Sequence, residues 1–330
     1  MKRYQNLYSN ICTIKNITKS HNEVCKNTRN KSRVENLKSY KNIYITRIQK
    51  ILQTKSYKVG PYNKFTIYEP KERHIVSQNL EDKIVNHLVA RYILYPAILP
   101  CLIDTNVASR KNLGTHSGLQ FATNFHNICK QKYGTYFILK CDISKFFASI
   151  DHDILKSKLL KRIKDKDALK IVFDIIDSNE IGLYIGSMTS QILAIFFLND
   201  MDHFIKEKLK IKYYVRYQDD FLLFHPDKNY LNYCLEQLKS FLQKEHLTLN
   251  TKTRIFKSTN NFLFLGRNVN SRYCRYRNVK RKLKARFHLY KTGKITLNSY
   301  VSSLQCYSSL CKKDFNIFWQ LLFVYHSLNL

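Results

Sequence analysis

The chain has 330 residues, of which 44% are hydrophobic and 13% aromatic, so it is long enough for two or three subdomains around a sizeable core. Its 56 Lys and Arg outnumber 24 Asp and Glu, which gives a formal net charge of +32. A charge this large repels itself in a compact state unless a polyanion neutralises it, so nucleic acid is the expected partner. The basic residues are spread along the whole chain, which argues against an amphipathic membrane helix.

Nine cysteines are scattered, without a Cys-x-x-Cys pair or a Cys and His cluster at zinc spacing. This odd number, together with a polar, basic N-terminus that lacks an apolar signal region, predicts reduced thiols in a cytoplasmic compartment. The longest apolar runs, such as Ile192–Leu198, are too short to cross a bilayer, so no membrane partner is expected.

Residues 1–60 are basic and weakly periodic, and they predict a partly helical extension with one helix over Val34–Leu52. The cations on its polar face either stay solvated or contact phosphates. Phe65–Pro70 alternates like a strand, and Arg73–Ser77 follows as its expected hairpin partner. Leu80–Leu94 predicts an amphipathic helix that the two following prolines close.

The middle of the chain combines helices with strands. Tyr136–Asp142 is strand-like and runs directly into an aspartate. Tyr213–Phe224 predicts a β-hairpin, because strand-forming residues flank the adjacent acidic pair Asp219 and Asp220. Helices are expected over Leu119–Tyr133, Asp153–Ile163 with Asp153 as its N-cap, Ala168–Ile176, Gln191–Leu209 capped by Thr189 or Ser190, and Tyr230–Glu245.

The last part begins with two strand-like segments, Leu247–Phe256 and Asn261–Val269, joined by a turn. From Arg272 the chain becomes very basic, and helices are expected over Leu297–Cys311 and Phe315–Leu328.

Asp142 and the pair Asp219 and Asp220 carry the chemistry that the sequence offers. Taken alone, the pair could be a solvated turn, in which aspartate is common. In a β-α-β-β arrangement, however, the strand of Asp142 and the hairpin can be neighbours in one antiparallel sheet, so that the carboxylates converge. Carboxylates this close require divalent cations, and oxygen ligands suit Mg²⁺. Two such ions can clamp the attacking and leaving oxygens of a phosphoryl displacement.

These segments resemble, in the same order, the motifs of a reverse transcriptase over residues 60–270. One such motif alone is weak evidence for this family, whereas this many motifs in the expected order are very specific to it. The matching segments are Phe65–Ser77 with Leu80–Leu88 and Arg110–His116 in the fingers, Asp142–His152, Ile185–Gln191 and the hallmark box Tyr217–Asp220 in the palm, then Leu249–Thr253 and a primer grip at Phe264, Leu265 and Gly266.

The resemblance implies that Asp142 and Asp219 ligate two Mg²⁺ ions, for which Mn²⁺ can substitute. Asp220 would support them, and the carbonyl of Ile143 would add a metal ligand. The primer 3′-OH would then attack the α-phosphate of a nucleotide while pyrophosphate leaves, with the protein contributing mainly positioning and charge neutralisation. Arg73 matches the triphosphate-binding arginine of the family.

Further residues are expected at the nucleotide. Phe147 stands where an aromatic ring would block a ribose 2′-OH and so favour dNTPs, or it packs in the core. Lys252 either donates a proton to the leaving pyrophosphate or is solvated. Arg110 and Lys111 are expected to contact the nucleotide or, alternatively, a template phosphate. Ile185, Gly186 and Gln191 are expected to contact the nucleotide from the palm loop.

The palm loop narrows the type of enzyme. Intron-encoded and retroviral reverse transcriptases usually have Gln-Gly and Ser-Pro where this chain has Ile185-Gly186 and Ser190-Gln191. This variant is similar to the enzymes of diversity-generating retroelements. Ile185 cannot make the hydrogen bond that an amide makes near the nascent base pair, so weaker discrimination of mispairs is expected. The resemblance to the retroelement type implies that the errors fall at template adenines. Gln218 replaces the more usual Ala or Met of the hallmark box, and the sequence offers no interpretation of it.

The fold that the resemblance implies is α+β: a right-hand polymerase with interleaved fingers and palm over residues 61–270 and a basic helical thumb over residues 271–330. The implied function is an RNA-directed DNA polymerase of a bacterial or phage-encoded diversity-generating retroelement. It would be cytoplasmic and act on template RNA, primer, cDNA and dNTPs, with a small basic accessory protein. The alternatives are a phage-defence protein of the same fold, a group II intron-like or retron-like reverse transcriptase, and a nucleic-acid binder with a decayed site, against which the intact aspartates argue.

Overall fold

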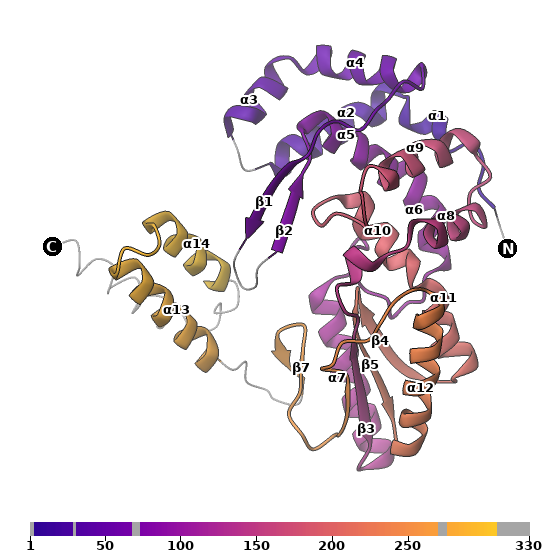
Figure 1. Ribbon diagram of the computed structural model, residues 1–330, viewed down its shortest axis with the longest axis vertical. Helices are drawn as coiled ribbons and strands as arrows, with labels where there is room; N and C mark the ends of the chain where they lie inside the picture. Colours follow the sequence, from indigo (N-terminus) through magenta and orange to yellow (C-terminus); the bar gives the residue numbers. More distant parts are fainter. Residues whose placement is uncertain (1–2, 29–30, 68–72, 270–275, 309–330) are drawn as a thin grey trace. The chain divides into compact units, whose positions relative to one another are not determined.

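The computed structural model describes residues 3–28, 31–67, 73–269 and 276–308 (Figure 1). The chain forms two compact units, Met1–Asn260 and Asn261–Leu330. This division differs from the expected one. The extension belongs to the same unit as the fingers and palm segments, and the second unit begins at residue 261 and not at residue 271.

The N-terminal extension is helical, with α1 (Tyr8–Ile11), α2 (Ile14–Asn27), α3 (Lys31–Ser39) and α4 (Lys41–Gln53). The single helix expected over Val34–Leu52 is wrong, because the chain breaks at Tyr40, where ψ is 28°. The break lets the apolar residues on both sides reach the core, since Leu37 and Ile48 are both buried. The spacing of the apolar residues does not reveal this break, because the stripe of buried residues continues on both sides of it.

The carboxylate of Asp82 ties this extension to helix α5 (Leu80–Val89). It accepts hydrogen bonds from Tyr57 Oη at 2.7 Å, Gly60 N at 3.1 Å and Asn79 Nδ2 at 2.8 Å. Asn79 also caps the helix by accepting from Asp82 N at 2.7 Å. The buried carboxylate is thus fully satisfied by its neighbours, as a buried charge requires.

Helix α5 continues without interruption as a π-helix, η1 (Ala90–Leu94), then α6 (Tyr95–Ile98) and a short 3₁₀ turn, η2 (Leu99–Cys101). The expectation that Pro96 ends the helix is wrong, because Pro96 lies in the first turn of α6, where a missing N–H costs no hydrogen bond. The whole stretch Leu80–Cys101 is long and apolar enough to span a membrane, but 56% of its most apolar window is buried inside the protein. It is a core helix that α2 and α10 (Met188–Phe197) cover.

Strands β1 (Asn63–Ile67) and β2 (Arg73–Ser77) form the expected antiparallel hairpin, with Phe65 opposite Ile75. Figure 1 shows this two-stranded ribbon extending from the N-terminal helices of the first unit. The tip between the strands lies outside the described residues.

A four-stranded antiparallel sheet forms the centre of the first unit, in the order β4-β5-β3-β6. Its two faces follow from the alternation of side chains along each strand. On one face Phe224 and Tyr213 contact Phe125 of α7, with ring centroids 6.1 and 5.5 Å apart. The opposite face packs into the main core beneath α12. The elements are β3 (Phe137–Asp142), β4 (Tyr213–Tyr217), β5 (Asp220–His225), β6 (Arg254–Lys257), α7 (Thr115–Tyr133) and α12 (Lys228–Lys244).

The other helices of the first unit lie where the sequence predicts them, with corrected ends and caps. Asp151, and not Asp153, caps α8 by accepting from Asp153 N and Ile154 N. Ser187 caps α10 in place of Thr189 or Ser190, and the helix expected to continue to Leu209 is interrupted at Leu198. The bounds are η3 (Phe146–Ser149), α8 (His152–Leu160), α9 (Lys166–Asp177), α10 (Met188–Phe197), α11 (Asn199–His203) and η4 (Phe204–Lys208).

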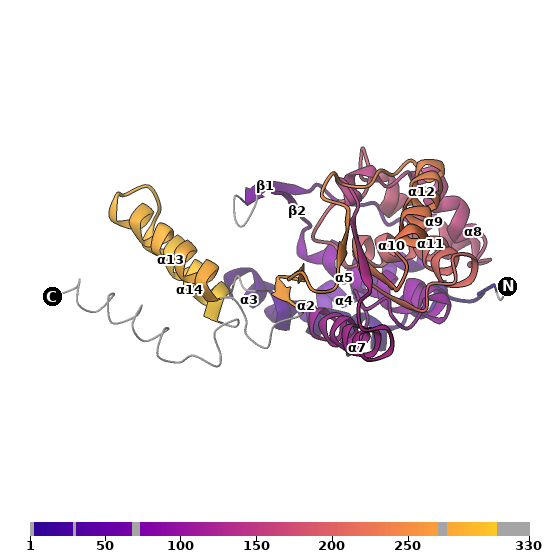
Figure 2. The ribbon, with the colours of Figure 1, turned by 90° about the horizontal axis from the view of Figure 1, so that it is seen from below.

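The second unit contains a small hairpin and two helices. The segment expected as one strand over Asn261–Val269 instead folds back on itself as β7 (Leu263–Phe264) and β8 (Arg267–Asn268). Helices α13 (Tyr276–Lys291) and α14 (Leu297–Ser308) run side by side (Figure 2). The buried Tyr300 stacks on Tyr290 between them. The helix expected over Phe315–Leu328 lies outside the described residues.

Candidate active site

The aspartates that the sequence singles out lie together at one end of the central sheet. Asp142 is the last residue of β3, and its Cα partner in the antiparallel pair is Asp220, the first residue of β5. Asp219 precedes it in the turn between β4 and β5. Because residues two apart in a strand share a face, Asp220 and its partner Asp142 lie on the same face of the sheet as Phe224, which α7 covers at its other end. The convergence expected from the β-α-β-β arrangement is therefore present.

Asp220 is a carboxyl group of this cluster with a strongly shifted pKa. Burial raises its pKa to about 6, the nearby charges of Asp142 and Asp219 add to the rise, and Lys140 opposes it. Lys140 Nζ lies 3.5 Å from Asp220 Oδ1. Without a cation, the neighbouring negative charges of these carboxylates repel one another. A bound cation would relieve this repulsion.

Lys140 is a site residue that the sequence analysis missed. It lies two residues before Asp142 on β3, so it shares a face with the carboxylates. The signal was present in the strand, since a lysine at an otherwise apolar strand position has to face solvent or a partner charge.

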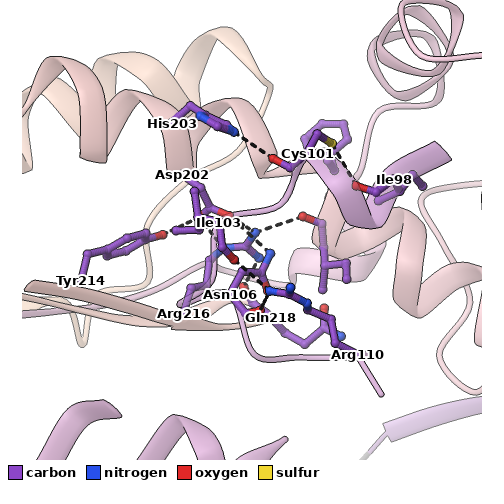
Figure 3. Close-up of polar contacts among 12 residues, drawn as sticks. Ile98, Cys101, Ile103, Asn106, Arg110, Asp202, His203, Tyr214, Arg216 and Gln218 are labelled. Carbon is purple, nitrogen blue, oxygen red and sulfur yellow. Dashed lines mark hydrogen bonds and ion pairs between the residues drawn. The ribbon is translucent and has the colours of Figure 1, made fainter. Parts of the chain in front are cut away.

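The turn that carries Asp219 rests on a buried ion pair. Arg216 and Asp202 are both inaccessible to solvent, and the guanidinium contacts the carboxylate at 2.7 and 2.5 Å. Tyr214 Oη donates to the same carboxylate at 2.6 Å. A second guanidinium nitrogen, Arg216 Nη1, donates to the carbonyl of Gln218 at 2.9 Å, so the pair reaches the apex of the hairpin (Figure 3).

A loop from the fingers side runs along the edge strand β4. Arg216 N donates to the carbonyl of Thr105 at 3.0 Å, and Val107 N donates to the carbonyl of Arg216 at 3.1 Å. Arg110 closes this loop, because its Nη1 donates to the carbonyls of Ile103 and Asn106 at 2.9 Å each (Figure 3). The guanidinium of Arg110 is thus used within its own loop, and its neighbour Lys111 is exposed.

The segment after Asp142 is bound to the loop that precedes β6. Asn250 N donates to the carbonyl of Asp142 at 2.7 Å, and Ile143 forms an isolated antiparallel bridge with Leu249. Lys252 follows in a turn in which its N–H donates to Asn250 Oδ1 at 3.0 Å, and its side chain is exposed. The structure therefore brings Lys252 and Asp142 onto adjoining backbone segments.

Phe147 lies under the palm loop. Its carbonyl accepts the N–H of Leu183 at 2.7 Å. Gly182 has a φ of +61°, and a Cβ at this position would lie 2.3 Å from the same carbonyl, so only glycine fits there. The ring of Phe147 is half-buried beside that of Phe146, with centroids 5.7 Å apart.

The palm loop also packs against the fingers hairpin. The rings of Tyr184 and Tyr62 meet edge to face with centroids 5.1 Å apart. Gly186 has a φ of +122°, and a Cβ there would lie 3.1 Å from the carbonyl of Val76 in β2. Tyr184 therefore joins the palm loop to the start of the fingers hairpin by an aromatic contact.

The C-terminal side of the palm loop is fixed to α5. The hydroxyls of Ser187 and Thr189 both donate to Asn86 Oδ1, at 3.0 and 2.5 Å. Between the fixed points Ile185 is 37% exposed, so it is the apolar side chain that this loop presents to solvent. Gln191 is exposed on the first turn of α10.

For two groups of expected site residues, the described structure gives no position relative to the carboxylates. Arg73 begins β2, and its side chain lies outside the described part of the molecule. Phe264, Leu265 and Gly266 form the turn of the small hairpin in the second unit, where Phe264 is buried and Leu265 has a φ of +48°.

The residues at the sheet end fit a magnesium site that is completed by substrate. Within the described ranges, no group of three or more His, Cys, Asp or Glu side chains is gathered as a self-sufficient metal site. The paired carboxylates of Asp142 and Asp220, with Asp219 beside them, offer only hard oxygen ligands. Mg²⁺ typically takes one or two carboxylates and completes its shell with water and phosphate oxygens, which matches this donor set.

Comparison with known proteins agrees with this architecture. A family model described as reverse transcriptase (RNA-dependent DNA polymerase) matches residues 24–269. The COX1/OXI3 intron 1 protein of Saccharomyces cerevisiae is 22% identical over 191 residues, which cover 54% of this chain and 22% of that protein. The COX1/OXI3 intron 2 protein of the same yeast is 25% identical over 182 residues, covering 51% and 20%. The matched region thus spans about a fifth of the length of these curated relatives.

Among solved structures, apo telomerase from Candida tropicalis, truncated from its C-terminal domain, is similar with a TM-score of 0.50. The identity is 15%, and the likeness covers 66% of this chain and 56% of that one. At this identity the likeness concerns the fold alone. The expected α+β polymerase fold of fingers and palm is confirmed.

Proposed function

Because the chain belongs to the reverse transcriptase family, we propose that it is an RNA-directed DNA polymerase that extends a primer by nucleotidyl transfer. The observation that carries this proposal is the placement of Asp142 opposite Asp220 with Asp219 in the adjoining turn. The carboxylates repel one another and the pKa of Asp220 is raised, so a bound cation would be favourable because it relieves this repulsion.

The residues supply positioning and charge neutralisation in this proposal. Asp142 and Asp219 would hold two Mg²⁺ ions, or Mn²⁺ in their place, with Asp220 in support. When bound, such ions neutralise phosphate charge and activate a hydroxyl as nucleophile. A bond forms between the primer 3′ oxygen and the α-phosphorus, while the bond to pyrophosphate breaks. Lys252 would donate a proton to the leaving pyrophosphate, a role supported by the hydrogen bond between Asn250 of its loop and the carbonyl of Asp142.

The rigid surroundings of the palm loop support a role in nucleotide selection. Hydrogen bonds hold the residues on both sides of Ile185 and Gly186, through Leu183 N and through the hydroxyl of Ser187, which supports a preorganised loop. The carbonyl of Phe147 accepts a hydrogen bond from Leu183, close in sequence to this loop, which supports the role of its ring as a barrier to a ribose 2′-OH. Arg73, Arg110, Lys111 and Gln191 remain proposed contacts to nucleotide or template.

We infer from Ile185 and Gln191 that the enzyme belongs to a diversity-generating retroelement, bacterial or phage-encoded, and copies with errors at template adenines. The second candidate is an intron-encoded reverse transcriptase, which is favoured by the two curated relatives, both named as intron proteins. The two candidates make different products, because only the first is expected to misincorporate selectively at adenines.

Template RNA and a growing cDNA are the proposed macromolecular partners, and the net charge of +32 suits them. A small basic accessory protein would carry charge of the same sign as this chain. The two proteins would therefore meet most favourably on shared RNA, where the polyanion screens their repulsion.

Primer extension tests the proposed activity. Purified chain is given poly(rA)/oligo(dT), dTTP and Mg²⁺, and the products are resolved by length. The wild type should extend the primer, and Asp142→Asn should lower the rate by roughly a thousandfold or more, as expected for loss of a metal ligand at the reacting phosphate. Asp174→Asn, which changes an exposed carboxylate on α9, is the matched control and should extend normally. Extension by Asp142→Asn at the wild-type rate would refute the proposal.

A further inference from the structure

Gln218, which has no interpretation in the sequence, lies at the apex of the catalytic hairpin next to Asp219. Its φ of +54° places it in the left-handed region, where residues other than glycine need support. Its carboxamide nitrogen Nε2 donates to Ser109 Oγ at 3.0 Å. Its carboxamide oxygen Oε1 is buried and accepts no hydrogen bond from the described residues. The side chain is therefore held at its nitrogen end only.

Ser109 connects this apex to a third element. Its hydroxyl donates to Gln191 Oε1 at 3.4 Å, so the hydrogen bonds run from Gln218 through Ser109 to Gln191. Ser109 also has a left-handed φ, of +53°. A serine hydroxyl can accept and donate at once, which is what this position between two carboxamides requires.

The loop that carries Ser109 is anchored firmly enough to act as a brace. It is hydrogen-bonded along β4 through Thr105 and Val107, and Arg110 closes it on itself. Asn106 Nδ2 also donates to the buried Asp202 at 3.3 Å (Figure 3). The same loop therefore contacts the edge strand, the buried ion pair and the apex of the hairpin.

We propose that Ser109 is a positioning residue that fixes the Gln218 apex and, through it, the backbone that carries Asp219. This inference rests on the proposed polymerase function, since it assigns a role within that site. Ser109 is not expected to touch substrate, and its effect passes through Gln218. Gln191 is the second support, because it accepts from the Ser109 hydroxyl.

The half-satisfied carboxamide of Gln218 makes the proposal specific. Ser109→Ala removes the acceptor of Nε2, which leaves both polar ends of the carboxamide without partners in a partly buried position. An unpaired buried polar group is costly, so the turn should rearrange to hydrate it. Gln218→Met, by contrast, removes both polar atoms together, which can be nearly neutral. Ser109 should therefore matter only while residue 218 is glutamine.

A double-mutant cycle of Ser109→Ala and Gln218→Met in primer extension tests this coupling. The substrate is poly(rA)/oligo(dT) with dTTP and Mg²⁺, and kcat and KM for dTTP are measured separately. Ser109→Ala alone should lower kcat roughly tenfold, as expected for a lost hydrogen bond to a buried partner, with KM changed less than about twofold. In the Gln218→Met background the same change should have no effect. Ser109→Gly, which relaxes the left-handed backbone but lacks the hydroxyl, should resemble Ser109→Ala.

Ser157→Ala is the matched control, because this exposed hydroxyl on α8 donates only to its own helix, at the carbonyl of Ile154. It should leave kcat and the melting temperature unchanged. Equal kcat for wild type and Ser109→Ala, or equal losses from Ser109→Ala in both backgrounds, would overturn the positioning role. A wild-type chain that fails to extend the primer at all would refute the polymerase proposal itself, which separates the two failures.

Discussion

Asp142 and Asp220 are directly opposite each other across β3 and β5, whereas Asp219 occupies the turn beside them. The two aspartates of the hallmark box thus differ in environment although they are adjacent in sequence. Asp220 is fixed within a ladder and contacted by Lys140, while Asp219 follows a residue with left-handed φ. This difference predicts unequal consequences when each is neutralised.

Asp219→Asn should abolish primer extension, with a loss of roughly a thousandfold or more, because a ligand at the reacting phosphate is removed. Asp220→Asn should retain measurable activity, with a loss of about tenfold to a hundredfold, since Asp220 is proposed to act in support. Single-turnover extension rates at saturating Mg²⁺ measure both. Greater damage from Asp220→Asn than from Asp219→Asn would reverse the assignment of the ligands.

Asp220→Asn should also stabilise the metal-free protein. Burial raises the pKa of Asp220 to about 6, so the ionised carboxylate costs free energy in the folded state at pH 7. Because the folded pKa lies above the unfolded one, the stability due to this group is present below about pH 4 and declines as pH rises through about 6. Urea unfolding in a chelator should therefore favour the variant by about 1–2 kcal/mol at pH 7 and by less at pH 5. An equal or lower stability at pH 7 would contradict this.

The buried pair of Arg216 and Asp202 should be far more important for stability than an exposed pair. Arg216→Met leaves a buried carboxylate without its partner, which should cost about 3–5 kcal/mol in unfolding free energy. Adding Asp202→Asn removes the stranded charge and should recover part of this loss, because an amide oxygen can still accept from Tyr214. As a control, Lys239→Met breaks the exposed contact with Glu236, at 2.7 Å, and should cost less than about 1 kcal/mol. A full loss that persists in the double variant would point to packing and not to charge.

The order of elements and the site could be predicted largely because local patterns determine them. The runs of strand-forming residues in Tyr136–Asp142 and in the hairpin identify strands, and the acidic residues at their ends identify one edge of the sheet. The register could not be predicted, since either aspartate of the hairpin could face Asp142 until the turn is known. That turn depends on a left-handed Gln218, which is held by Arg216 of the same hairpin and by Ser109 from a distant part of the chain.

Contacts between distant residues also explain the errors. Asp202 lies in a segment that reads as one apolar helix, and nothing nearby signals its pairing with Arg216. Tyr40 interrupts a helix whose apolar pattern continues beyond it. Pro96 was expected to end a helix, but the π-helical turn before it allows a new helix to begin there. Each outcome was decided by tertiary packing and not by local preference.

Ile185 gives a test of copying fidelity with a control in the same loop. If an amide at this position discriminates mispairs, Ile185→Gln should reduce misincorporation at template adenines, by about tenfold for one recovered hydrogen bond. Ile181→Gln makes the same chemical change at a side chain that is 75% exposed, and it should leave the error spectrum unaltered. Sequencing of cDNA from a mixed template measures both. An unchanged spectrum for Ile185→Gln would remove the support for a retroelement enzyme and favour the intron-type candidate.

Asp165 should anchor the N-terminal extension by capping two helices at once. Its Oδ2 accepts from Leu7 N and Tyr8 N at 2.8 and 2.9 Å, and its Oδ1 accepts from Ala168 N at 3.0 Å. Although burial opposes ionisation, these N–H donors hold the pKa of Asp165 below its ordinary value. An asparagine has only one acceptor oxygen, so Asp165→Asn must leave one set of donors unpaired, at a cost of about 1–2 kcal/mol.

The matched control for Asp165→Asn is Asp227→Asn at the start of α12, where a single oxygen accepts from Asn229 N at 2.7 Å and asparagine caps equally well. It should be nearly neutral. Because the pKa of Asp165 is lowered in the folded state, its contribution is complete above the unfolded value of about 4 and is lost as pH falls through the lower folded value. The difference between Asp165→Asn and wild type should therefore be constant from pH 5 to 8 and shrink only below about pH 4. Hydrogen exchange should show faster exchange at Leu7 and Tyr8 in the variant, and unchanged protection there would mean that Asp165 does not hold the extension in place.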